Sequence, residues 1–278
     1  MKVGDIDLVF VSDGTMRLDG GALFGSVPKV SWKVLSPADR RNRVLICLNC
    51  LLIRAPGKVI LVDTGLGNKH PLRRRKIYAM KAGGLIKGLK ALGLGPEDVD
   101  TVLLTHLHLD HAGGCTSRAH EDSVVPTFPR AQYLAQRKDW REATHTNERS
   151  RASYVLEDLL PLEEARQLEL LDGDTEVAQG VYIKHTGGHT AGHQMVYMEA
   201  GDQRVACLGD VLPTPHHLPI PYVASLDIYP NDTLEYKRRL LVQAEKERWL
   251  LAFSHALTPR AWYLVRRQGK LTLDTGEL

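Results

Sequence analysis

A run of seven residues, T-H-L-H-L-D-H at 105–111, concentrates three imidazoles and one carboxylate. Zinc, iron and manganese accept both kinds of ligand at neutral pH. The run directly follows a leucine-rich, strand-like segment, so His106 and His108 would leave a strand end on the same side. If the chain then turns into a helix, Asp110 and His111 can face a second point nearby. The spacing therefore suits two adjacent metal ions better than one.

Three further metal-binding side chains follow strand-like segments later in the chain. His189 lies in T-G-G-H-T, Asp210 in L-G-D, and His255 directly after the apolar stretch Trp249–Phe253. Functional side chains of α/β folds gather just past strand ends. We therefore expect all three to join the 105–111 run in one metal site.

A structural zinc site is a weaker interpretation, because closed structural sites favour cysteine-rich shells. Cys47 and Cys50 do form a C-x-x-C, but it lies inside a β-like run, where residues three apart point to opposite faces. The sequence contains no second C-x-x-C to complete such a site.

The order of the remaining elements predicts an α/β protein. Strands are expected at 6–11, 44–54, 58–62, 99–105, 167–171, 181–185, 194–198, 204–208 and 249–253. Helices are expected at 85–92, 136–144, 153–160 and 232–247, the last with Asp232 as its N-cap. No linker or repeat interrupts this alternation, which favours one domain over 1–278, with 1–43 as an N-terminal strand and loop.

Composition narrows the function classes. The 278 residues are 43% hydrophobic and 25% charged, as in ordinary globular proteins, and the net charge of +3 gives no case for a nucleic-acid partner. No stretch approaches the roughly 20 apolar residues of a membrane helix, so no membrane partner is expected. Asp5 and Asp7 occupy the place of a signal peptide's apolar run. We therefore expect a cytoplasmic protein.

Together, T-H-x-H-x-D-H, G-G-H-T-x-G-H, the later G-D and the strand-end histidine resemble the motif set of the metallo-β-lactamase superfamily, in the same order. The resemblance covers Asp63 to His255 and implies a four-layer αβ/βα sandwich with two divalent metal ions. Zinc is favoured, with iron, manganese or cobalt as alternatives. The implied ligands are His106, His108 and His189 for one ion, and Asp110, His111 and His255 for the other, with Asp210 as the bridge.

The resemblance also assigns roles around the metals. Asp63, in Asp-Thr-Gly, is expected to hold the His106 segment through hydrogen bonds, although a turn cap is the alternative. His193 is expected to be an orienting or structural residue. A metal-bridging hydroxide would attack the substrate, and Asp110 and Asp210 would be the catalytic carboxylates, with Asp110 able to pass on a proton.

Two segments point to a branch of the superfamily. D-G-G-A-L-F-G-S-V-P-K at 19–29, with Trp32, and G-D-V-L-P-T-P-H-H at 209–217 are similar to a branch that contains quorum-quenching N-acyl-homoserine lactonases and methyl parathion hydrolase. The lactonase group is the closer match, which implies opening of a lactone ring of the N-acyl-homoserine type, and the resemblance suggests a homodimer. Phosphotriester or arylester hydrolysis is the alternative. A phosphodiesterase or nuclease is a further alternative. The near-neutral net charge of the chain argues against it, because nucleic-acid binding relies on positive charge.

The candidate substrate-binding residues are less securely placed by the sequence. Phe24 and Trp32 could cover an acyl chain beside the metals, or could simply pin the N-terminal loop to the core. His216 lies in the loop after Asp210 and could line the pocket. Some lactonases of this branch carry a tyrosine shortly after the bridging aspartate. Residues 211–214 contain none, and Tyr222 or a loop histidine is the candidate for the same role.

Overall fold

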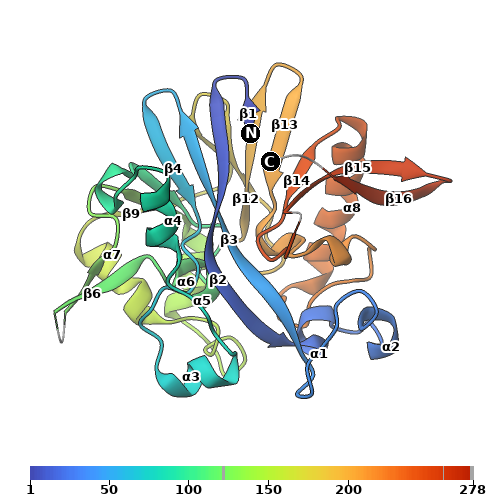
Figure 1. Cartoon of the computed structure of the whole chain (residues 1–278), viewed down its shortest axis with the longest axis horizontal. Coiled ribbons are helices and arrows are strands. Elements are labelled where there is room, and N and C mark those ends of the chain that lie inside the picture. The colour runs from blue at the N-terminus through green and yellow to red at the C-terminus, as the bar shows by residue number, and fades with distance from the viewer. Residues whose placement is uncertain (121–122, 259, 276–278) are drawn as a thin grey trace.

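Two seven-stranded sheets dominate the computed structural model, which describes residues 1–120, 123–258 and 260–275 (Figure 1). The first sheet has the order β1-β2-β3-β4-β5-β8-β9. Its strands are β1 (Lys2–Val3), β2 (Ile6–Asp19), β3 (Arg43–Ala55), β4 (Lys58–Val62), β5 (Thr101–Leu103), β8 (Gln132–Gln136) and β9 (Leu168–Leu171). The antiparallel pairing of β3 with β4 around the Pro56–Gly57 turn is as the sequence predicts.

The second sheet runs in sequence order from β10 to β16. Its strands are β10 (Thr175–Ala178), β11 (Val181–His185), β12 (Gln194–Ala200), β13 (Gln203–Cys207), β14 (Leu250–Ala252), β15 (Ala261–Arg267) and β16 (Lys270–Thr275). Strands β13 and β14 are parallel, as are β4, β5, β8 and β9 in the first sheet. A small hairpin of β6 (Thr116–His120) and β7 (Ser123–Pro126) stands apart from both sheets.

The two sheets pack face to face, and helices cover their outer faces. Side chains of both sheets, among them Ile53, Leu103, Val196 and Leu250, form one buried cluster between them. The helices are α4 (Leu85–Ala91), α5 (Leu109–Ala112), α6 (Arg137–Thr144), α7 (Leu160–Glu164) and α8 (Pro230–Lys246), with 3₁₀ turns η1 (Pro96–Asp98), η2 (Leu156–Asp158), η3 (Gly209–Val211) and η4 (Pro215–His217). A second buried cluster lies under α4, α6 and α7, and a third under α8. This is the expected αβ/βα arrangement of four layers.

The N-terminal segment differs from the expected short strand and loop. Strand β2 continues to Asp19, and two short helices follow it, α1 (Gly20–Phe24) and α2 (Lys29–Trp32). Asp19 caps α1 by accepting hydrogen bonds from the backbone N–H groups of Gly21 and Ala22. Together with α3 (Leu72–Ile77), these helices lie along the lower edge of the molecule in Figure 1.

Two helix predictions were wrong in detail, and proline explains both. Residues 153–160 do not form a helix; instead, α7 begins at Leu160 with Pro161 in its first turn. Proline disfavours helical geometry in the residue before it but fits a helix start. Similarly, α8 begins at Pro230, so Asp232 lies in the first turn and is not the N-cap.

Among the described residues, no helix combines the length and apolar character that crossing a membrane requires.

Candidate metal centre

Four strands end at the same edge of the two-sheet sandwich and deliver the seven side chains expected to bind metal. His106 and His108 follow β5, and α5 carries Asp110 and His111. His189 follows β11, Asp210 lies in η3 after β13, and His255 follows β14. The first sheet therefore supplies four of the seven groups and the second sheet supplies three.

The side chains fall into three overlapping groups whose donor atoms lie within 4.8 Å of one another. The groups are His106, His108 and His189; His106, His111 and Asp210; and Asp110, His111 and His255. Within them, His189 Nε2 lies 3.0 Å from His108 Nδ1, and His111 Nε2 lies 3.1 Å from His255 Nε2. All seven predicted groups thus converge on one small volume.

Asp210 lies between the two ends of this volume. Its Oδ1 is 3.2 Å from His255 Nε2 and 3.4 Å from His111 Nε2, whereas its Oδ2 is 3.5 Å from His189 Nε2. One carboxylate therefore faces both groups of histidines with different oxygens, which is the arrangement that a bridging ligand requires.

The donor set fits divalent cations. His106 Nε2 is buried and has no hydrogen-bond partner in the part of the chain that the structure describes, although burying such a group without a partner is costly. Several ring nitrogens lie 3.0–3.1 Å from one another. Imidazole and carboxylate donors that converge in this way, without cysteine, are typical of catalytic zinc and of related transition metals.

The protonation preferences of His106, His108 and Asp210 agree with metal binding. Burial lowers the pKa values of His106 and His108 well below the usual range, so both rings are neutral at neutral pH. Burial alone would raise the pKa of Asp210, but nearby His255 and His111 outweigh it and hold that pKa well below its usual value. Neutral imidazole and ionised carboxylate are the forms that bind a cation. At His111, His189 and His255, burial would lower the pKa, but nearby carboxylates outweigh it and raise the pKa above its usual value, so a bound cation would displace a proton there.

Asp63 lies behind the ligands, directly after β4, in the left-handed region with φ of 58°. Its Oδ2 accepts a hydrogen bond from His111 Nδ1 at 2.8 Å. Its Oδ1 accepts hydrogen bonds from the backbone N–H of Thr105 at 2.8 Å and from the Thr105 hydroxyl at 3.0 Å. The carboxylate thus holds the residue before His106 and also orients the His111 ring, leaving His111 Nε2 free for the centre.

His193 lies behind Asp210. Its Nε2 accepts a hydrogen bond from the backbone N–H of Asp210 at 2.8 Å, and its Nδ1 donates to Thr186 Oγ1. Gly209 has φ of 53°, and a Cβ there would lie 2.5 Å from His193 Nε2. The glycine therefore permits the close approach by which His193 supports the Asp210 turn.

Three supporting contacts had no recognisable signal in the sequence. Asp227 Oδ1 accepts a hydrogen bond from His189 Nδ1 at 2.7 Å, and the carbonyl oxygen of Cys47 accepts one from His255 Nδ1 at 2.7 Å. Asp139, on α6, accepts one at 2.7 Å from the backbone N–H of Leu107. Neither aspartate belongs to a recognised motif. Any residue type can provide a backbone carbonyl, so the contact of Cys47 O with His255 could not be predicted from the sequence.

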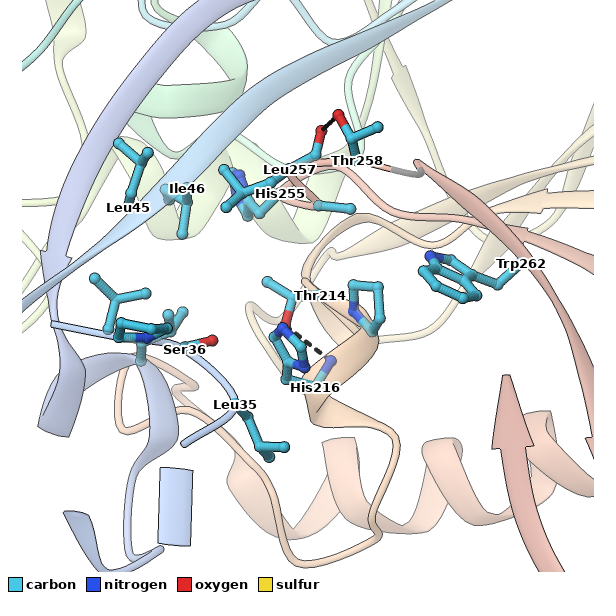
Figure 2. A pocket seen from close by; sticks show the side chains of 15 residues that line it. Leu35, Ser36, Leu45, Ile46, Thr214, His216, His255, Leu257, Thr258 and Trp262 are labelled. Atoms are coloured by element: carbon cyan, nitrogen blue, oxygen red, sulfur yellow. Dashed lines mark hydrogen bonds between the residues drawn. The ribbon is translucent and has the colours of Figure 1, made fainter. Parts of the chain in front are cut away.

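An apolar cavity of about 320 Å³ adjoins the ligands, because His255 is part of its wall (Figure 2). Its other walls come from α1, from residues 35–37, from β3, and from the loop after η3. The lining residues are Leu23, Leu35, Ser36, Pro37, Val44, Leu45, Ile46, Thr214, Pro215, His216, His255, Ala256, Leu257, Thr258 and Trp262.

The four candidate substrate-binding residues have different positions. His216 lines the cavity, whereas Tyr222 does not. Phe24 and Trp32 are 0% and 1% exposed and stack on each other, with ring centroids 5.4 Å apart. Both rings lie in a buried cluster with Met16, Leu23 and Ile46, and so pack the N-terminal segment against the core. That segment reaches the cavity through Leu23 and 35–37 instead.

Comparisons with known proteins agree with this geometry. The family model of the metallo-beta-lactamase superfamily matches residues 48–255. An N-acyl homoserine lactonase of a Bacillus species is 30% identical over 161 residues, which are 54% of this chain and 57% of that protein. An N-acyl homoserine lactonase of Bacillus thuringiensis is 27% identical over 220 residues, which are 74% of this chain and 80% of that protein.

Solved structures extend the similarity to the whole fold. A probable metal-dependent hydrolase from Staphylococcus aureus has a TM-score of 0.91 and 27% identity, with complete coverage of both chains. AidC, a dizinc quorum-quenching lactonase solved with a product, has a TM-score of 0.83 and 17% identity over 100% of this chain and 97% of that one. The chain belongs to the metallo-beta-lactamase superfamily and is a hydrolase of that fold.

Proposed function

We propose that this hydrolase opens the lactone ring of N-acyl-homoserine lactones at a centre of two divalent metal ions. The observation that carries the proposal is that His255 belongs both to the ligand cluster and to the wall of an apolar cavity. A substrate whose carbonyl lies at the cluster can therefore extend an aliphatic chain into that cavity. The curated relatives named as N-acyl homoserine lactonases support the same substrate class.

The ligand geometry supports a two-ion centre. His106, His108 and His189 would hold one ion, Asp110, His111 and His255 the other, and Asp210 would contribute one oxygen to each. Zinc fits the donor set best, with iron, manganese and cobalt as alternatives. Bound ions of this kind acidify water and polarise a carbonyl oxygen.

The protein's own groups would then manage protons and position the substrate. The Asp110 side chain is 13% exposed and that of Asp210 is 11%, whereas the His111, His189 and His255 side chains are each 2% exposed. The carboxylates thus face the open side of the centre. We assign Asp110 to accept the proton of the attacking water and to return it to the leaving alkoxide of the ring. His216, on the cavity wall, would contact the acyl amide of the substrate.

A direct test compares substrates on the zinc-loaded protein. Ring opening releases a proton, so a pH indicator follows turnover of N-acyl-homoserine lactones, while paraoxon-type esters are followed through their coloured leaving group. We expect a higher kcat/KM for the lactones. Phosphotriester turnover without lactone turnover would reverse the assignment.

The variant Asp110→Asn tests the proton transfer. A positioned acid or base contributes about 10²- to 10⁴-fold to the rate, and the variant should lose a factor of that size in kcat. Zinc content is measured in parallel, because Asp110 is also a proposed ligand. An unchanged kcat with unchanged zinc content would remove Asp110 from the mechanism.

A further inference from the structure

The segment 213–227, here called the strap, connects the metal centre to the cavity. It begins three residues after Asp210 and ends at Asp227, which orients His189. Between these ends, Thr214, Pro215 and His216 form one wall of the cavity (Figure 2). The position of the strap therefore affects how much room a substrate has beside the metals.

Not all backbone carbonyl groups of the strap accept hydrogen bonds from the strap's own N–H groups. It contains four prolines, at 213, 215, 219 and 221, which have no N–H to donate, and it contains no β-strand. The backbone hydrogen bonds within its second half are short-range, such as those from Tyr222 N to Pro219 O and from Val223 N to Pro221 O. Its carbonyl groups consequently need donors from elsewhere.

Arg149 supplies donors to the carbonyls of Ser225 and Asp227, and Lys237, in the middle of α8, supplies them to the carbonyls of 219, 220 and 222. Its side chain is fully buried, at 0% exposed, and its Nζ donates to Pro219 O at 2.7 Å, to Tyr222 O at 2.9 Å and more weakly to Ile220 O at 3.4 Å. No ion pair to Lys237 is found among the described residues. Burial lowers the pKa of Lys237 to about 7. A buried amine is costly unless it is hydrogen-bonded, and here three strap carbonyls provide its acceptors.

The other side of the strap is fixed to α1. His217 Nε2 donates to Leu23 O at 2.9 Å, and the His217 ring stacks on Phe24 with centroids 4.8 Å apart. The backbone N–H of Ser225 donates to Ala22 O at 3.0 Å. The strap is thus held between α1 and α8, and Lys237 provides its side-chain hydrogen bonds with α8.

We propose that Lys237 is a positioning residue that sets the shape of the apolar cavity by fixing the strap, and so sets the preference for acyl-chain length. The second half of this statement rests on the proposed lactonase function. The first half concerns the cavity alone and can be tested without turnover. Methionine at position 237 would keep most of the buried volume but leave the Ile220 and Tyr222 carbonyls without a donor and Pro219 O with only the Tyr222 N–H, so the strap would relax.

The experiment compares Lys237→Met with Lys237→Arg, which keeps the charge and the donors, and with Lys246→Met, a control at an exposed position of the same helix. The first measurement is the affinity of the apolar dye N-phenyl-1-naphthylamine. We expect Lys237→Met to weaken binding about tenfold, which corresponds to about 1.4 kcal/mol. Lys237→Arg should recover most of the affinity, and Lys246→Met should match the wild type.

The second measurement is turnover of lactones with short and long acyl chains. In Lys237→Met, KM for the long chain should rise about tenfold, while kcat for the short chain and the zinc content stay within about twofold of the wild type. If Lys237→Met does not fold, Lys237→Gln, whose amide can donate to two carbonyls, takes its place.

Several outcomes would overturn the proposal. Unchanged dye affinity in Lys237→Met, with only a lower melting temperature, would make Lys237 a purely structural residue. An equal loss of kcat for all chain lengths, with loss of zinc, would mean that it acts on the metal centre and not on the cavity. If the wild type opens no lactone, the proposed function fails, but the dye measurement still decides the role of Lys237.

Discussion

At the scale of single residues, the centre depends on partners that bind no metal themselves. Asp63 orients His111, Asp227 orients His189, and the carbonyl of Cys47 orients His255. In each case the hydrogen bond occupies Nδ1 and leaves Nε2 facing the centre. Such contacts select the tautomer and raise the basicity of the ligand.

Asp227→Asn tests this arrangement at the position that the sequence did not reveal. An amide oxygen can still accept the hydrogen bond from His189 Nδ1, but the negative charge is lost. We expect zinc affinity to fall about 10- to 100-fold, as is typical for the loss of such partners. Competition with a coloured zinc chelator measures it. Asp232→Asn, at an exposed position at the start of α8, is the control. Equal zinc affinity in both variants would show that the Asp227 charge is not needed.

At the scale of elements, the ligands depend on tight turns that follow strand ends. His189 comes after Gly187 and Gly188, whose φ angles are +62° and +85°. A Cβ at Gly188 would lie 2.7 Å from the backbone nitrogen of Thr233 in α8, whereas the nearest atom to a Cβ at Gly187 is 3.8 Å away. Both positions disfavour an L side chain, but only Gly188 is also crowded by backbone.

The pair Gly188→Ala and Gly187→Ala separates these two effects. Both variants should lose about 1 kcal/mol or more of unfolding free energy because of their positive φ angles. Gly188→Ala should in addition weaken zinc binding, since the His189 turn must move away from α8. Urea denaturation and zinc titration report the two quantities separately. Equal zinc affinity in the two variants would mean that the turn accommodates the methyl group without moving His189.

At the scale of the whole molecule, the centre joins the two sheets. Four ligands come from the end of the first sheet and three from the end of the second, so bound ions would link the two halves of the sandwich. The buried His106 Nε2 finds no hydrogen-bond partner among the residues that the structure describes. Metal binding should therefore contribute directly to folding stability.

Removal of the metal tests this link. At free zinc about a thousandfold above the dissociation constant, binding contributes about 4 kcal/mol. For a chain of this length, that corresponds to a fall in melting temperature of about 8–16 °C after chelation. Calorimetry of the stripped protein should show the fall, and zinc should reverse it. Magnesium should not restore the melting temperature, because it prefers oxygen ligands. A melting temperature unaffected by chelation would contradict the structural link.

The sequence by itself identified the side chains that gather at the centre, because the ability to bind a metal depends on residue type and local spacing. T-H-L-H-L-D-H at 105–111 and the strand-end residues His189, Asp210 and His255 carry this information directly. The alternating pattern of strands and helices likewise predicted most of the elements. Two of its errors arose where proline started a helix, at Pro161 and Pro230, and so shifted a boundary that periodicity alone could not locate. It also did not predict the short helices α1, α2 and α3, the β6–β7 hairpin, or the strands β15 and β16.

Only the tertiary structure decided what surrounds the ligands. Asp227, the burial of Phe24 and Trp32, and the contact of Lys237 with the strap all join segments that are distant in the chain or lack a periodic pattern. The residue type of a carboxylate or an aromatic side chain does not reveal whether it lies in a core, on a cavity wall or behind a metal ligand. Its environment depends on which backbone packs against it, and that is a property of the folded sandwich as a whole.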